Sequence, residues 1–359
     1  MRYDNFLNNV EIYNVTENHY DIFMRYYGGK SKLLDLINQG VSETGLKNNS
    51  VFLDAFSGTS VVGQFFKLQN HTIYSNDTLN FCYTLAKGLV GLNNQPKFKK
   101  FDKHPLEILN SSKGTNGFLT VNFSPFESSK RQYFSVKNAQ KIDSINLKIH
   151  TWLSEGKINK NEFYYLKTSL LKAVNLVSNV SGTYGAFLKT WDARALKPIK
   201  LESFDIYNNG KKNKIYNDDI NKLVKNIKTD IAYFDPPYNS RQYHSNYFIL
   251  ELISRGWFEK NYIPKGITGM VDFSDLKSAY SSKVEAFTNL ESLVKNIDTK
   301  YILLSYNNEV IIETEAIKKL LKDKGRLKII DKEHKRYRSI NQDGSNIKTK
   351  EFLYVVKVD

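Results

Sequence analysis

The sequence predicts an α/β fold with a mostly parallel sheet and an antiparallel hairpin at one edge. Short apolar runs alternate along the chain with stretches of helical periodicity, an order typical of parallel strands joined by crossover helices. Two apolar runs near the C-terminus have no helix between them, which favours an antiparallel pair there. A long basic segment separates the early strands from the later ones, so we also expect an inserted, mainly helical module.

The composition is ordinary for a soluble globular protein of 359 residues, with 41% hydrophobic and 25% charged residues. The one cysteine, Cys82, excludes a disulfide within the chain and suits a reducing compartment. The sequence has neither an apolar run long enough to span a membrane nor a basic-then-apolar signal pattern at its N-terminus. We therefore expect a cytoplasmic protein.

Positive charge is concentrated in the middle of the chain. The net charge is +15, and residues 95–212 contain 20 Lys and Arg against 9 Asp and Glu, an excess of 11. A lysine-rich proteome would raise the charge throughout, whereas a basic module promotes association with a polyanion. We therefore divide the chain into a sheet domain, residues 1–94 and 213–359, and an inserted basic domain, residues 95–212.

Two glycines precede the first predicted helix. Residues 1–24 are polar and aromatic without clear periodicity, and we assign them no role. Gly28 and Gly29 let the backbone approach a ligand closely, and a helix is expected over residues 31–39. A plain turn before a helix is the alternative interpretation of these glycines alone.

Two strand–turn–helix units follow, as at the start of a Rossmann-like sheet. Strands are expected over residues 51–54 and 72–77, and helices over 61–68 and 79–91. Each strand ends in an aspartate, and the two carboxylates lie about twenty residues apart, as in nucleoside-binding sheets. One would suit an amino group near the first turn, and the other would suit ribose hydroxyls.

A later strand ends in a rigid, polar sequence. The apolar run over residues 230–234 leads into Asp235-Pro236-Pro237-Tyr238. Prolines have no N–H to donate and a fixed φ, so they end the strand and hold the carboxylate and the ring in one relationship. The carboxyl ends of strands are where open α/β sheets bind ligands.

The remaining predicted elements complete the sheet and the insert. Helices are expected over residues 132–153, 160–177, 245–258, 276–297 and 309–322, and strands over 214–219, 301–306, 327–331 and 351–358. A polar loop rich in lysine and arginine joins the last two strands. Within the insert, a glycine-punctuated loop over residues 181–191 mixes aromatic residues with lysine.

These motifs and their order resemble the Dam-like alpha group of N6-adenine DNA methyltransferases. The matching motifs are Gly28-Gly29-Lys30, Asp54-Ala55-Phe56-Ser57-Gly58, Asn76-Asp77 and, after the basic insert, Asp235-Pro236-Pro237-Tyr238. Three further features resemble the modification enzymes of type II restriction systems: the extended motif over residues 235–243, Ser305-Tyr306-Asn307-Asn308, and Arg336-Tyr337-Arg338. The resemblance covers the chain from about Arg25 to its end. It implies the Rossmann-like fold of S-adenosylmethionine-dependent methyltransferases, with an inserted target-recognition domain.

The resemblance implies a site for S-adenosylmethionine. The two glycines and Asp54 would hold its methionine portion, with Asp54 at the amino group, and Asp77 would bind the ribose hydroxyls. Asp219, or its neighbour Asp218, would bind the adenine; we prefer Asp219 because the next helix opens directly after it. The complete expected cofactor set is Tyr26, Gly28, Gly29, Asp54, Phe56, Gly58, Asp77 and Asp219.

The resemblance also implies contacts with double-stranded DNA. Lys30 would reach the DNA near the target, and Arg241 and Gln242 would contact the flipped nucleotide or its vacated partner. The complete expected DNA-binding set is Lys30, Tyr184, Lys189, Trp191, Arg194, Arg241 and Gln242. For the four residues of the insert, surface positions without a DNA role are the alternative, and for Arg241 and Gln242 the alternative is a solvated loop.

The expected catalytic residues suit methylation of an amino group. The lone pair of adenine N6 is delocalised into the ring, so the nitrogen becomes nucleophilic only when acceptors gather its hydrogens. Asp235 supplies one acceptor, the Pro236 carbonyl oxygen can supply another, and Pro237 fixes both. Tyr238 can stack on a base that has left the helix.

One residue departs from the family pattern. The glycine loop of the group usually ends in a second glycine, where this chain has Ser60. A glycine there permits positive φ, whereas a serine can cap the following helix. We therefore expect altered but not absent cofactor binding.

Other functions remain as alternatives or are disfavoured. An N6-adenine methyltransferase acting on RNA shares the catalytic motif, and a non-catalytic DNA-binding regulator could use the same fold. Methylation of cytosine C5 requires a thiolate, and Cys82 lies in an apolar helical pattern. The histidines lack metal-ligand spacing, so we expect no metal. We also expect a monomer, with a restriction endonuclease encoded nearby as a functional partner.

Overall fold

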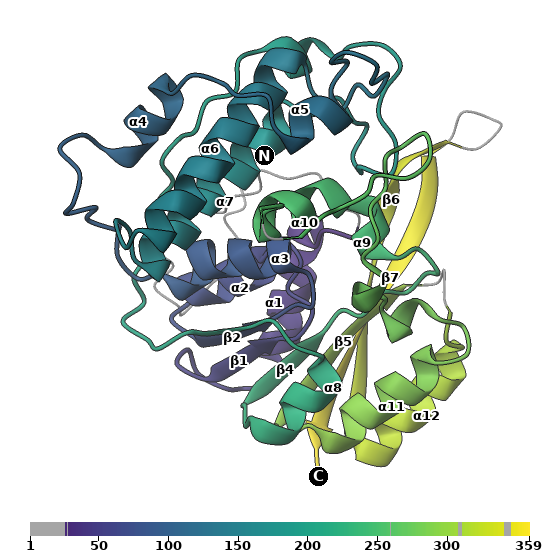
Figure 1. Cartoon of the computed structure of the whole chain (residues 1–359). Helices are drawn as coiled ribbons and strands as arrows, with labels where there is room; N and C mark the ends of the chain where they lie inside the picture. Colours follow the sequence, from purple (N-terminus) through teal and green to yellow (C-terminus); the bar gives the residue numbers. More distant parts are fainter. Residues whose placement is uncertain (1–25, 27, 259, 308–310, 341–345) are drawn as a thin grey trace.

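One seven-stranded sheet organises the chain in the computed structural model (Figure 1). Its strands are β1 (Val51–Asp54), β2 (Thr72–Asn76), β3 (Lys214–Tyr216), β4 (Ile231–Phe234), β5 (Tyr301–Asn307), β6 (Gly325–Ile340) and β7 (Asn346–Val358). Their order is β3-β2-β1-β4-β5-β7-β6. The first five are parallel, and β7 lies antiparallel between β5 and β6. The predicted fold class is confirmed.

The structure describes residues 26, 28–258, 260–307, 311–340 and 346–359. The predicted N-terminal arm over residues 1–24 and Asn308 lie outside these residues. Of Arg336-Tyr337-Arg338, only the backbone is described. Across the described ranges, no helix has the length and apolar character that crossing a membrane requires.

Helices cover both faces of the sheet because successive strand residues point to opposite sides. Phe52 and Tyr233 belong to one apolar cluster, and Leu53 and Phe234 to another. Burial on both faces explains why the parallel strands are continuous apolar runs in the sequence. The first face is covered by α1 (Leu34–Ser42), α2 (Val61–Leu68), α3 (Asn80–Ala86) and α10 (Phe248–Arg255), and the second by α8 (Ile220–Leu223), α11 (Ala286–Asn296) and α12 (Thr314–Lys324) (Figure 1).

The basic insert lies over the first helical layer (Figure 1). Its helices are α4 (Pro105–Ser111), α5 (Phe118–Phe123), α6 (Val136–Ser154) and α7 (Lys160–Leu176), and the two long ones confirm the sequence prediction. α7 begins with a capping box formed by Asn159 and Glu162. The apolar cluster continues from α6 and α7 into α3 and α10, and the Thr168 hydroxyl donates to the Thr84 carbonyl oxygen at 3.1 Å. The insert therefore shares its core with the sheet domain.

The helix predicted over residues 276–297 begins only at Ala286. Before it the chain makes two 3₁₀ turns, Ser274–Leu276 and Ala279–Ser281. The Gln242 side chain holds the backbone of Ser278 there: Nε2 donates to the Ser278 carbonyl oxygen at 3.2 Å, and Oε1 accepts from the Ser278 N–H at 2.9 Å. Contacts with a distant segment thus replace helical hydrogen bonds, which periodicity alone does not reveal.

The polar loop predicted between the last two strands is largely strand. The pairing of β6 with β7 continues through Lys335 and Lys348 before an irregularity near the turn. An antiparallel ladder is held by backbone hydrogen bonds, so a lysine-rich stretch can extend a hairpin without apolar side chains. The helix predicted over residues 245–258 is divided into α9 (Tyr243–Asn246) and α10 at Tyr247, whose φ is −128°.

Candidate active site

A cavity of about 350 Å³ lies at the carboxyl ends of β1, β2 and β4. Open α/β sheets bind ligands at this edge. The cavity is lined by many of the predicted residues, namely Tyr26, Gly28, Phe56, Asp77, Asp219, Asp235 and Pro237. A second part of its wall, Asp275–Tyr280, comes from the 3₁₀ turns before α11 and was not predicted.

Asp54 is the last residue of β1 and is 1% exposed. Its Oδ2 accepts a hydrogen bond from the Gly63 N–H in the first turn of α2, at 3.1 Å. Burial, together with the nearby Asp235 carboxyl, raises the pKa of Asp54 to about 8 despite that bond. A ligand ammonium group beside Asp54 would favour its ionised form.

Asp77 joins the loops that follow β1 and β2. Its Oδ2 accepts from the Gly58 N–H and its Oδ1 from the Leu79 N–H, both at 2.9 Å. Burial raises the pKa of Asp77 to about 6, although these two bonds oppose the shift. Gly58 has a φ of +48°, and a Cβ there would lie 2.9 Å from the Tyr26 ring, so only glycine fits this loop without strain.

Ser60 does not cap α2, which corrects the sequence prediction. It precedes α2 with a φ of +64°, in the left-handed region, and its side chain makes no capping hydrogen bond. Among the described residues, its buried Oγ has no hydrogen-bond partner. The loop therefore keeps the backbone conformation of a glycine and places a serine in it, at a cost in strain.

Asp219 lines the cavity, while Asp218 is not among its lining residues. The Asp219 side chain caps α8 by accepting from the Asn221 N–H at 2.9 Å. Nearby, the rings of Phe56 and Tyr280 meet edge to face with centroids 5.0 Å apart, and Tyr280 Oη donates to Asn221 Oδ1 at 2.6 Å. A carboxylate beside an aromatic corner can hold a planar base that bears an amino group.

Asp235 follows β4 and forms an ion pair with Lys30, whose Nζ lies 3.0 Å from Oδ1. The same Nζ donates to Glu351 Oε1 at 3.0 Å. Burial raises the pKa of Asp235 to about 6, with Lys30 opposing and Glu351 adding to the shift. Burial alone would lower the pKa of Lys30, but Asp235 and Glu351 raise it well above its usual range. The loop that follows β4 is thus built around one buried, charged lysine.

Aromatic rings surround the glycine turn before α1. Tyr26 stacks on Tyr247 with centroids 4.8 Å apart, and Tyr238 lies 5.3 Å from Lys30 Nζ, measured to its ring centre. Gly28 has a φ of +77°, and a Cβ there would lie 2.9 Å from Tyr243 Oη. The turn therefore requires glycine for its backbone angle and for space. In the part of the chain that the structure describes, no group of three His, Cys, Asp or Glu residues could hold a metal ion.

Comparison with known proteins identifies the family of this site. Residues 26–336 match the family described as D12 class N6 adenine-specific DNA methyltransferase. The chain belongs to this family. It is 42% identical to "Modification methylase StsI" of Streptococcus sanguinis over 84% of the chain and 46% of the relative. It is 39% identical to "Type II methyltransferase M.FokI" of Planomicrobium okeanokoites over 94% of the chain and 53% of the relative.

A further relative has nearly the same length. The chain is 33% identical to "Type II methyltransferase M.NlaIII" of Neisseria lactamica, over 93% of the chain and 99% of the relative. By contrast, the chain spans about half the length of the StsI and M.FokI methylases. Members of a methyltransferase family of this kind use S-adenosylmethionine as the methyl donor.

Two residues predicted to contact DNA in this D12 methyltransferase are buried. Lys30 is 4% exposed and belongs to the charged cluster around Asp235. Tyr184 is 1% exposed; its N–H donates to the Asn246 carbonyl oxygen at 2.6 Å, and its carbonyl oxygen accepts from Tyr133 Oη at 3.0 Å. Both side chains are buried in this structure, and their DNA contacts stay predictions. Tyr184 anchors the glycine-punctuated loop to α9, which follows the Asp235-Pro236-Pro237-Tyr238 motif in the chain.

Two more predicted DNA contacts brace loops. Arg194 bonds to Asp192 Oδ2 at 3.0 Å and to the Val180 carbonyl oxygen at 2.8 Å. Gln242 holds the cavity wall through Ser278, as described above. Lys189 and Arg241 are exposed and Trp191 is half-buried, so their DNA contacts stay predictions.

The sequence did not single out Glu351 or the Asp275–Tyr280 wall. The only signal for Glu351 is an acid that opens the apolar run of β7, where a charged residue facing the core needs a partner. For the wall, the pattern over residues 276–297 indicated a helix, because a local pattern does not reveal the contacts with Gln242 and Phe56 that position these 3₁₀ turns.

Proposed function

We propose that this chain transfers a methyl group from S-adenosylmethionine to N6 of an adenine flipped out of double-stranded DNA. The observation that best supports this activity is the position of Asp235, which lines one cavity together with Asp77 and Asp219. The modification methylases among its relatives support a role in a restriction–modification system, with a cognate endonuclease as the functional partner. We place this activity in the cytoplasm and in a monomer.

The cavity fits the methyl donor in size and in chemistry. Its volume of about 350 Å³ lies within the range of small-molecule sites. Asp54 is not among the lining residues but directly precedes Ala55, which is; kept largely protonated by burial, it would ionise beside the donor's ammonium group. Asp77 would bind the ribose hydroxyls. Asp219, Phe56 and Tyr280 would hold its adenine. S-adenosylmethionine supplies an electrophilic methyl group on a sulfonium, which needs alignment and no metal.

The catalytic motif would prepare the target nitrogen. Asp235 Oδ and the Pro236 carbonyl oxygen would accept the two hydrogens of the adenine amino group, directing its lone pair at the methyl group. These acceptors act mainly in the transition state, which raises turnover. Tyr238 would stack on the flipped base, and such stacking contributes about 1–3 kcal/mol, which offsets much of the cost of extrusion.

Incubation of the purified protein with labelled S-adenosylmethionine and unmethylated duplex DNA tests this function. We expect label in N6-methyladenine after digestion to nucleosides, and stronger competition by duplex DNA than by RNA. Label on cytosine, or preferential methylation of RNA, would contradict the proposal. S-adenosylmethionine binding without methylation of any nucleic acid would instead indicate a regulator on this fold. Sequencing the methylated DNA would then identify the recognition site.

A further inference from the structure

Glu351 is a buried acid with one cationic partner among its described contacts. It lies on β7 opposite Asn307 of β5, and 2% of its surface is exposed. Its Oε1 accepts the hydrogen bond from Lys30 Nζ at 3.0 Å, across 321 residues of sequence. Burying a carboxylate costs several kcal/mol unless its partners compensate. The interaction with Lys30 therefore compensates for the cost of burying this carboxylate.

Lys30 connects Glu351 to the catalytic carboxyl group. Its Nζ lies 3.0 Å from Asp235 Oδ1 and 3.0 Å from Glu351 Oε1, and it faces the Tyr238 ring at 5.3 Å. One ammonium group between two carboxylates cannot fully neutralise both. The strength of its interaction with Asp235 therefore depends on the charge of Glu351.

We propose that Glu351 is a positioning residue for methyl transfer, which holds the Lys30 ammonium beside Asp235 and shares its charge. This inference rests on the function proposed above. A carboxylate paired with an unshared ammonium is a weaker acceptor for an adenine amino group. By sharing Lys30, Glu351 keeps Asp235 ordered and still able to accept that hydrogen bond.

The other groups around Asp235 are consistent with this arrangement. Burial first, and then the Asp235 charge, raise the pKa values of Asp54 and Tyr233; for Tyr243, burial and Tyr238 come before Asp235 among the causes of the raised pKa. The two tyrosines stay neutral at physiological pH because their pKa values lie well above the usual one. Lys30 is thus the cation that faces Asp235, and Glu351 is the group that competes for it.

The variant Glu351→Gln removes the charge and keeps an acceptor for Lys30. Single-turnover methylation of unmethylated genomic duplex DNA would be measured across pH. We expect the plateau rate to fall about tenfold, the scale for a group one contact removed from a site. We expect the acid side of the rate–pH profile, where the rate falls, to move about 1 pH unit lower. The reason is that Lys30 then pairs with Asp235 alone and lowers the pKa of Asp235 further. S-adenosylmethionine affinity should not change, and Glu351→Asp should restore the original acid side of the profile.

A surface variant provides the matched control. Asp331→Asn removes a carboxylate from β6, where it pairs with Lys350 at 2.9 Å. It changes the net charge by the same amount as Glu351→Gln, and we expect the rate and the pH profile to stay unchanged.

Titration of Asp235 by carboxyl ¹³C NMR does not depend on methylation. We expect its pKa to fall in Glu351→Gln. If the rate falls while the acid side of the rate–pH profile and this titration stay in place, Glu351 is only structural and the inference is wrong. If the unchanged protein methylates no DNA, the proposed function fails, and the NMR titration still decides the effect of Glu351. If Glu351→Gln does not fold, Glu351→Asp decides instead. Because this variant keeps the carboxylate, a shift in the acid side of its rate–pH profile would contradict the inference.

Discussion

At the residue scale, the site contains three buried carboxyl groups with raised pKa values. The pKa values are about 8 for Asp54, about 6 for Asp77 and about 6 for Asp235, and burial is the largest cause in each case. Hydrogen bonds from backbone N–H groups partly oppose the shift at Asp54 and Asp77, and Lys30 partly opposes it at Asp235. The folded site therefore binds more protons near neutral pH than the same residues do when unfolded. Ligands that bring positive charge or amino hydrogens should release those protons.

Replacing Asp235 and Asp77 should give different losses. Asp235→Ala should retain S-adenosylmethionine binding and lower the single-turnover rate by about 10²–10³-fold, because a transition-state acceptor is lost. Asp77→Ala should mainly weaken S-adenosylmethionine binding, by about 1.5–3 kcal/mol, because hydrogen bonds to a charged group are lost. Calorimetry measures the affinity, and rapid-quench kinetics measures the rate. Exchange of the two results would contradict the role assignments.

S-adenosylmethionine affinity should rise with pH toward about 8. Below the raised Asp54 pKa of about 8, the carboxyl is protonated in the free protein, and binding the donor's ammonium must release that proton. The dissociation constant should then fall by up to about tenfold per pH unit, until the ligand's α-amino group titrates near about 7.7–8.0. Calorimetry in buffers of different ionisation enthalpy measures the proton release. Asp54→Asn should remove most of the release near pH 7–8, where Asp77 and Asp235, with pKa values of about 6, are already largely ionised. Affinity that does not depend on pH in the unchanged protein would refute the prediction.

At the element scale, the sequence predicted the helices, strands and turns whose conformation depends on neighbouring residues in the chain. The buried strands, the two long helices of the insert and the rigid Asp235 motif all have local signals: apolar runs, periodicity and proline. The divided helix at Tyr247 and the 3₁₀ turns at Asp275–Tyr280 have none, because distant side chains such as Gln242 determine them. The Ser60 conformation was missed for a related reason: the turn geometry, set by Asp77 and Gly58, overrides the capping preference of serine.

Two substitutions in the loop before α2 should change stability in opposite directions. Ser60→Gly should stabilise the fold by about 1 kcal/mol, because a left-handed residue with a side chain is strained, although the added freedom of the unfolded chain offsets part of this gain. Gly58→Ala should destabilise it, because φ is +48° and the new Cβ would lie 2.9 Å from the Tyr26 ring. Urea unfolding measures both, and a less stable Ser60→Gly protein would contradict the strain argument.

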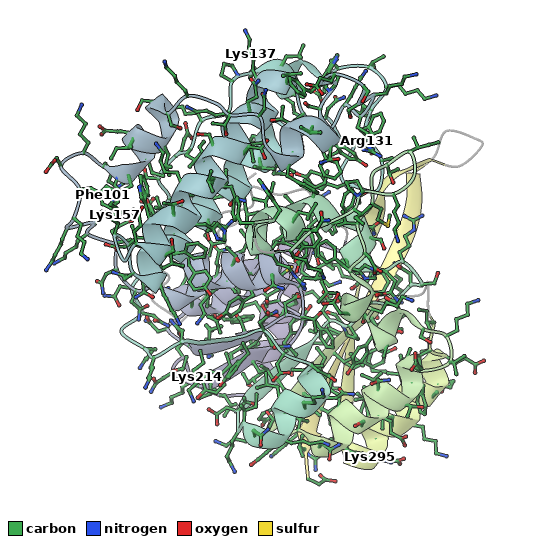
Figure 2. The ribbon with its side chains drawn as sticks, in the orientation of Figure 1. Phe101, Arg131, Lys137, Lys157, Lys214 and Lys295 are labelled. Atoms are coloured by element: carbon green, nitrogen blue, oxygen red, sulfur yellow. The ribbon has the colours of Figure 1, made fainter. Side chains whose placement is uncertain are left out.

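At the scale of the whole molecule, composition indicated the basic insert, but contacts across the chain were beyond sequence reasoning. The Lys30–Glu351 pair spans 321 residues, and the core of the insert merges with the layer over the sheet. Neither follows from a local pattern. In Figure 2, Lys137 and Lys157 lie on the part of the molecule that the insert forms, whereas Lys295 lies at the opposite, lower end. The excess positive charge of residues 95–212 belongs to the insert, whose helices lie over one face of the sheet.

This asymmetry should make DNA binding depend on salt, and S-adenosylmethionine binding should not. If the insert neutralises phosphates, DNA affinity should fall at least tenfold between about 50 mM and about 200 mM salt, because counterions released on binding must be reabsorbed. Lys189→Gln should weaken binding to all sequences and reduce the slope of log affinity against log salt by about 1. Lys295 on α11 pairs with Glu291 at 2.8 Å; Lys295→Gln removes the same charge from the layer on the other face of the sheet and should leave the slope unchanged. Fluorescence anisotropy across a salt series measures both slopes. Equal effects of the two variants would mean that net charge, and not the insert, attracts the DNA.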